Sequence, residues 1–211
     1  MKNIYIDANP TLLFKNSFRV SNYIGDKVKN LNSIFISLES AYEDQAVSSK
    51  SIDLLLVNCR NKFRCMPSYS PKSIENYLIL ERPDNVVICG YRVPDIVWLA
   101  VCNKLKINTI YFQHGFDIDH VKRRINSMLK DYMKVIKYAL GVVRLSFYLG
   151  VSPIRFCLDY INFVVFGADF KGTLFEDIRL WPNKFFVWAD YYIKFWENKI
   201  QTWEKDRYGA G

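Results

Sequence analysis

The fold follows from the stretch Asn85-Val86-Val87-Ile88-Cys89-Gly90, because an apolar run that stops at a glycine is typical of a buried strand. Residues 92–106 come next and have the apolar spacing of a helix. A second apolar run, Thr109-Ile110-Tyr111-Phe112, then leads into Gln113-His114-Gly115. A strand, a helix and a strand in this order form a βαβ unit, which builds a parallel sheet with a right-handed crossover.

The rest of the chain extends this pattern in both directions. Apolar patterning predicts strands over residues 3–8, 33–38 and 184–189, and helices over residues 12–29, 73–80 and 190–203. Residues 51–58 are apolar almost throughout; we predict a strand there, although a buried helix has the same pattern. Alternating strands and helices predict an α/β fold with a Rossmann-like, mostly parallel sheet and flanking helices.

Length and composition limit the class of protein. The chain has 211 residues, of which 50% are hydrophobic and 24% charged, which excludes a disordered chain and favours one substantial core. The longest stretches without Lys, Arg, Asp or Glu have 10 residues, against the roughly 18 to 20 that span a bilayer. The N-terminus resembles a strand and not a secretion signal, so we expect a cytoplasmic protein. The five cysteines form no CxxC pair and are expected to be buried free thiols.

The positive charge is concentrated in one segment. The formal net charge is +8, and residues 121–155 contribute +7 of it, with eight basic side chains against Asp131 alone. Apolar residues recur at helical spacing over 121–136, which predicts a basic amphipathic helix suited to an anionic membrane surface. Aromatic and aliphatic runs at 145–150 and 160–166 extend the apolar surface. The membrane-facing basic residues are Lys122, Arg123, Arg124, Lys130, Lys134 and Lys137.

Two other interpretations of this segment stay open. The first is a solvated basic helix whose apolar face packs on the core. The second is a contact with nucleic acid, which we do not expect, because the sequence has no helix-turn-helix, RNP-like or zinc-finger pattern.

The candidate site lies in two loops that follow predicted strands. In open parallel sheets ligands bind beyond the carboxyl ends of the strands, where loops and helix N-termini converge. A histidine there can remove a proton near pH 7, because its reference pKa is about 6.5. The candidate catalytic residue is therefore His114, and the candidate substrate-binding residues are Gly90, Arg92, Gln113, Gly115 and Asp117. A structural histidine bonded to a loop carbonyl is the alternative for His114.

Several other kinds of site are not indicated. Residues 113–120 hold two His and two Asp, but their spacing matches no zinc, calcium or non-haem iron motif, so no metal is predicted. The sequence contains no GxGxxG, Walker or GxSxG motif, and no cofactor is expected.

The run from Asn85 to Gly90, the helix after it, and Ile110-Tyr111-Phe112-Gln113-His114-Gly115 resemble the N-terminal half of GT-B glycosyltransferases of bacterial surface polysaccharide biosynthesis, such as capsule or lipopolysaccharide. Residues 186–196 resemble the strand-to-helix stretch near the crossing to the second domain of these enzymes. The chain is also distantly similar to CDP-glycerol glycerophosphotransferases, in which an HG pair like His114-Gly115 supplies the base. The resemblance covers about residues 85–120 and 183–200.

This resemblance implies one half of a GT-B architecture. The chain would be the acceptor-side domain of a membrane-associated glycosyltransferase, incomplete alone because the half that holds the donor nucleotide is missing. His114 would deprotonate the acceptor, Arg92 or Asp117 would orient it, and the nucleotide sugar would be a substrate. The partners would be a glycan or lipid-linked acceptor, a nucleotide-sugar-binding second domain or subunit, and an anionic membrane at the inner face of the cell membrane.

The domain organisation that fits this interpretation has three parts. They are a Rossmann-like core over 1–120, a membrane-facing basic and aromatic helical segment over 121–182, and a strand and helix over 183–211 that return to the core. The alternative is a non-catalytic membrane-anchoring subunit that recruits a separate glycosyltransferase, with Trp196 and Trp203 at the contact.

Overall fold

The computed structural model describes residues 1–7, 17, 19–28, 31–38, 62–65, 70–89, 93–112, 132–166 and 177–186. The strands within these ranges are β1 (Lys2–Asp7), β2 (Asn32–Ser37), β3 (Lys62–Cys65), β4 (Asn85–Ile88), β5 (Asn108–Phe112) and β6 (Lys184–Phe186). The helices are α2 (Arg19–Gly25), α4 (Pro71–Glu81), α5 (Val93–Lys104), α7 (Tyr132–Leu149) and α8 (Pro153–Phe166), with the 3-10 helix η3 (Ile178–Leu180) before β6.

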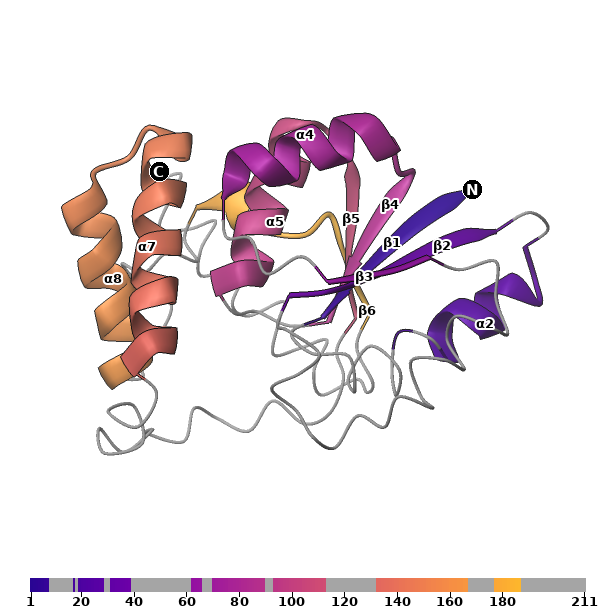
Figure 1. Ribbon diagram of the computed structural model, residues 1–211, viewed down its shortest axis with the longest axis horizontal. Coiled ribbons are helices and arrows are strands. Elements are labelled where there is room, and N and C mark those ends of the chain that lie inside the picture. Colours follow the sequence, from indigo (N-terminus) through magenta and orange to yellow (C-terminus); the bar gives the residue numbers. More distant parts are fainter. Residues whose placement is uncertain are drawn as a thin grey trace, which may run out of the picture.

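The sheet has the order β3-β2-β1-β4-β5-β6, and all five neighbouring pairs are parallel. The chain therefore starts in the middle of the sheet, builds β2 and β3 on one side, and returns to build β4, β5 and β6 on the other (Figure 1). This is the strand order of Rossmann folds. The predicted α/β class with a Rossmann-like parallel sheet is confirmed.

The elements agree with the sequence patterns in most places. β1, β2, β4, β5, α4 and α5 lie within two residues of their predicted ends. The strand predicted over 51–58 lies outside the described residues. Three differences stand out. β3 was not predicted. α2 ends at Gly25, before the predicted end at Lys29, and α7 runs through Gly141 as one helix into the aromatic run at 145–149.

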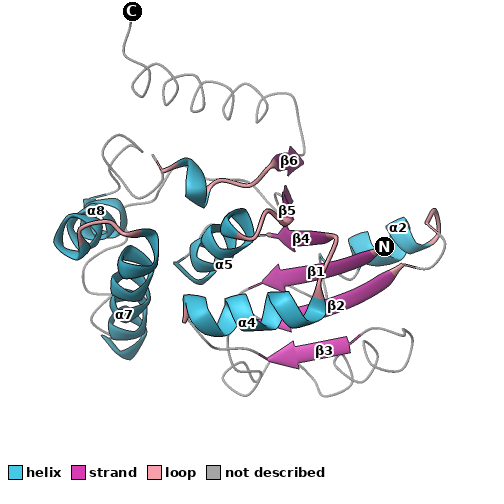
Figure 2. Cartoon of the chain, turned by 90° about the horizontal axis from the view of Figure 1, so that it is seen from above, coloured by secondary structure: helices cyan, strands magenta, loops and turns pink. Residues whose placement is uncertain are grey.

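The two faces of the sheet are covered by different helices. Successive side chains of a strand point to opposite faces, so Ile4 and Ile6 contribute to one core, and Tyr5 contributes to the other. The larger core holds Trp98 of α5, which is fully buried, together with side chains of α4. On the opposite face Tyr5 stacks on Phe35 with ring centroids 5.1 Å apart, under Val20 of α2. Figure 2 shows α4 and α5 over the strands, as seen from above.

The helix α5 is the centre of the larger core. Every residue from Val93 to Cys102 is buried, as expected for a helix whose sequence there is apolar on all sides apart from Asp95. Burial raises the pKa of the Cys102 thiol far above its ordinary value, so this cysteine stays protonated. The prediction of buried free thiols is confirmed for Cys89 and Cys102, whereas Cys157 is half-buried.

The helices α7 and α8 lie side by side at one end of the molecule (Figures 1 and 2). Val142 and Leu145 of α7 and Phe156 of α8 are buried in the larger core, so this pair is continuous with the packing around α5. Within the described ranges, no helix combines the length and the apolar character needed to cross a membrane.

Candidate functional site

The carboxyl ends of the parallel strands form one edge of the sheet. Asp7, the last residue of β1, pairs with Ser37, the last residue of β2. On the other side Ile6 pairs with Ile88, so Cys89, the residue after β4, follows in the row of Asp7. Asp7 and Ser37 are fully buried and Cys89 is 3% exposed. Three polar or thiol side chains from separate segments thus line the same row at this edge.

A fourth polar side chain reaches this row from the stretch before α2. Ser17 is buried, and its Oγ lies 3.3 Å from Cys89 Sγ, within hydrogen-bonding distance for sulfur. The backbone continues the parallel pairing here, because the N–H of Leu38 donates to the carbonyl oxygen of Asp7 at 3.0 Å. The carboxylate, hydroxyl and thiol groups of these residues form a buried polar floor at the edge of the sheet.

This floor lies at the topological switch point of the fold. The chain proceeds from β1 outward to β2 on one side, and β4 pairs with β1 on the other side. In open α/β sheets the connections after two such strands diverge to opposite faces, and the crevice between them is where ligands bind. The position of Asp7 between Ser37 and Cys89 therefore marks the candidate site.

The N-terminal end of α5 adds a second buried carboxylate. α5 begins at Val93, soon after β4 ends, and Asp95 lies in its first turn with no exposed surface. A carboxylate is stabilised in the first turn because the free backbone N–H groups and the helix dipole are positive there. In the described part of the chain, no three His, Cys, Asp or Glu side chains are grouped so that they would hold a metal ion.

The site residues predicted from the sequence come after β4 and β5 along the chain, and they lie outside the described residues. They are His114, Gly90, Arg92, Gln113, Gly115 and Asp117, together with the basic residues Lys122, Arg123, Arg124 and Lys130. Lys134 and Lys137 belong to α7, but the structure describes only their backbone. The described residues therefore do not test whether the predicted site residues lie close together.

The sequence analysis did not single out Asp7, Ser37 or Ser17. A usable signal exists for two of them, because Asp7 and Ser37 each end an otherwise apolar strand, Ile4-Tyr5-Ile6 and Ile34-Phe35-Ile36. A polar residue at the carboxyl end of a predicted parallel strand is a candidate for the ligand edge. Ser17 offers no comparable pattern.

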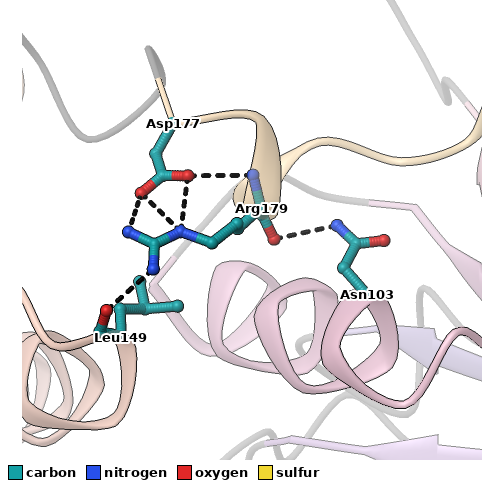
Figure 3. Close-up of polar contacts among 4 residues, drawn as sticks. All are labelled: Asn103, Leu149, Asp177 and Arg179. Carbon is teal, nitrogen blue, oxygen red and sulfur yellow. Dashed lines mark hydrogen bonds and ion pairs between the residues drawn. The ribbon is translucent and has the colours of Figure 1, made fainter.

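A separate polar network holds the segment that leads into β6 (Figure 3). Arg179 Nε donates to both carboxylate oxygens of Asp177, at 2.9 and 3.0 Å, and Arg179 Nη1 donates to the carbonyl oxygen of Leu149 at 2.7 Å. Hydrogen bonding to Asp177 raises the pKa of Arg179. Asn103 Nδ2 donates to the carbonyl oxygens of Arg179 and Trp181. These contacts tie η3 to α5 and to the end of α7, so the network is structural.

Comparison with known proteins adds a distant likeness to solved structures. No protein-family model and no curated protein matches the sequence. Among solved structures, UDP-GlcNAc 2-epimerase from Methanocaldococcus jannaschii is similar over 67% of this chain, with 18% identity and a TM-score of 0.38. The matched part is 37% of that epimerase, so the chain spans well under half of its length. The Rossmann-like assignment rests on the strand order of the chain itself.

Proposed function

We propose that this chain is the acceptor-side domain of a glycosyltransferase that moves a sugar from a nucleotide-sugar donor to a lipid-linked or polysaccharide acceptor. The observation that supports the proposal most is the strand order. It brings the ends of β1, β4 and β5 to one edge of the sheet, with Asp7 at the switch point. The residues that follow β4 and β5 in the chain are Cys89-Gly90 and Gln113-His114-Gly115.

The proposed reaction is a glycosyl transfer that uses one general base. His114 accepts the proton of the acceptor hydroxyl while that oxygen forms a bond to the anomeric carbon of the donor sugar. The bond from the anomeric carbon to the phosphate oxygen breaks, and the nucleotide leaves with the electron pair. Arg92 or Asp117 orients the acceptor, which contributes through proximity. The donor nucleotide is held by a second domain or subunit.

The test compares the only two histidines of the chain. In the complete enzyme, His114→Ala should lower transfer of labelled sugar from a mixture of UDP-, GDP- and CDP-activated sugars into membrane lipid extract by about 10²–10⁴-fold, the usual contribution of a general base. His120→Ala, with equal loss of an imidazole, should leave transfer within about twofold of the wild type. Both variants should keep the thermal unfolding midpoint. Transfer that survives in His114→Ala would remove the base assignment.

The intact mass of the protein in its own cells tests whether the donor-binding half belongs to the same polypeptide. If the donor-binding half belongs to the same polypeptide, the intact mass should be near twice the 24.9 kDa of this chain. A mass near 24.9 kDa that accompanies a copurifying catalytic subunit would favour the membrane-anchoring interpretation.

A further inference from the structure

The outer side of α7 carries large apolar side chains that the protein leaves uncovered. Ile136, Leu140 and Phe147 are 49%, 50% and 70% exposed. Their spacing of four and seven residues places them on one helix face. The buried residues Val142 and Leu145 lie on the opposite face, toward the core. The exposed face therefore points away from the rest of the molecule.

The neighbouring helix α8 repeats the arrangement. Ile154 and Leu158, four residues apart, are 75% and 54% exposed, while Phe156 is buried in the same core as Val142. Both inner faces pack on one core, and the two helices lie side by side (Figures 1 and 2). Each exposed face, which is opposite the buried one on its helix, therefore points away from that core. We name this the outer α7–α8 surface, made of Ile136, Leu140, Phe147, Ile154 and Leu158.

Arginines accompany the apolar residues. Arg144 is exposed and continues the spacing of Ile136 and Leu140, and Arg155 is exposed beside Ile154. From Tyr132 to Phe166 the two helices hold four basic residues and one acidic residue, Asp159, which is half-buried. An apolar surface edged by positive charge is complementary to the boundary between the acyl chains and the headgroups of an anionic bilayer.

We propose that the outer α7–α8 surface is inserted in the interface of an anionic membrane, with both helices roughly parallel to its plane. Phe147, Ile154 and the aliphatic residues are buried about 5–10 Å into the boundary between the headgroups and the acyl chains. Arg144 and Arg155 bind lipid phosphates. Neither helix crosses the bilayer, in agreement with the absence of a membrane-spanning helix among the described residues.

A second copy of the chain is a poorer occupant of this surface. A twofold contact would use the same patch on both molecules. It would bring Arg144 and Arg155 toward their own counterparts, and the only acidic residue of the two helices is half-buried. Like charges at such a contact are costly.

The test uses the full chain and vesicles of phosphatidylcholine, either alone or mixed in roughly equal amount with phosphatidylglycerol. The wild type should sediment with the mixed vesicles. Phe147→Glu and Ile154→Glu should each weaken this binding at least about tenfold, because each removes an apolar anchor and adds a repelled charge. The matched control is Leu80→Glu on α4, where the side chain is 78% exposed but outside the surface, and it should bind as the wild type does.

A second set of variants tests the charge. Arg144→Gln and Arg155→Gln should each weaken binding to the mixed vesicles by about fivefold, with little change for phosphatidylcholine alone. All substitutions are at exposed positions, so the thermal unfolding midpoint should stay constant. Binding of Phe147→Glu equal to that of the wild type would overturn the proposal. The proposal would also be overturned if the wild type did not bind vesicles but formed a stable dimer that Phe147→Glu dissociates. The surface would then be a protein interface.

This inference deepens the membrane association of the proposed enzyme and does not depend on its chemistry. The vesicle measurement needs neither a donor nor an acceptor, and the His114→Ala measurement needs transfer. A failure of one is therefore visible without the other.

Discussion

At the scale of single residues, Asn183 ties the start of β6 to the sheet. Its Oδ1 accepts hydrogen bonds from the backbone N–H of Thr109 at 2.7 Å and from Thr109 Oγ1 at 2.8 Å. Thr109 is fully buried, so its donors have no access to water. Asn183→Ala leaves both donors without this acceptor and should lower the free energy of unfolding by about 1–3 kcal/mol, measured by urea denaturation.

The matched control for this change is Asn183→Asp. The aspartate keeps the acceptor oxygen at the same place, so we expect a smaller loss of stability than for alanine. Equal losses for the two variants would mean that the hydrogen bonds to Thr109 are not what stabilises the join.

At the scale of elements, α5 and α7 end in the same way with different residues. After α7, Gly150 has φ of 70°, its N–H donates to Phe147 and the next N–H donates to Ser146. After α5, Lys106 has φ of 57° and makes the equivalent bonds. This C-terminal motif favours glycine at the left-handed position, because a Cβ there is strained. No atom lies within 4 Å of a Cβ built on Gly150, so only backbone strain matters. Gly150→Ala should cost about 1 kcal/mol.

The opposite change is the converse prediction for α5. Lys106→Gly should raise the free energy of unfolding by up to about 1 kcal/mol, since it removes the strain at the same position. Lys106→Ala keeps a Cβ at positive φ and serves as the control; it should leave the urea midpoint unchanged. A gain of stability in Lys106→Ala would point to the lysine side chain and not to the backbone.

At the scale of the whole molecule, the α7–α8 pair and the sheet share one core. Leu145 is 1% exposed and packs in the core that also holds Ile4 of β1 and Trp98 of α5. Leu145→Ala should lower the free energy of unfolding by about 2–5 kcal/mol. It should also speed amide hydrogen exchange in β1 and in α7 together, because both depend on the same packing. Leu140→Ala on the exposed face of the same helix is the control.

Leu140 is half-exposed, so we expect its replacement to cost well under about 1 kcal/mol. If Leu145→Ala speeds exchange in α7 while β1 keeps its protection, the helical pair unfolds separately and the shared core is not cooperative.

The parts predictable from the sequence are those with local causes. The apolar runs Ile4-Tyr5-Ile6, Ile34-Phe35-Ile36 and Val86-Val87-Ile88 all form strands, because continuous apolar runs of this length are typical of strands buried on both faces. β3 was missed because Lys62-Phe63-Arg64-Cys65 is short and carries two charges, so its pattern is not that of a buried strand. Its place in the sheet comes from pairing with β2, which is a contact far along the chain.

The candidate site likewise has a part that the sequence predicts and a part that depends on contacts between distant segments. The expectation that ligands bind after β4 and β5 came from the order of elements. The row formed by Ser37, Asp7 and Cys89 depends on the register between β2, β1 and β4, and the sequence pattern does not predict that register.

The sequence by itself determined the α/β class, the parallel connections and the excess of positive charge near α7, because burial pattern and charge are local properties of the chain. The tertiary structure alone decided the strand order and the row at the switch point. It also decided which apolar face of α7 is covered: Leu145 is buried and Leu140 is half-exposed, although both are leucines of one amphipathic helix. The physical reason is that burial depends on which distant segments pack against a side chain, and the periodicity of a helix does not contain that choice.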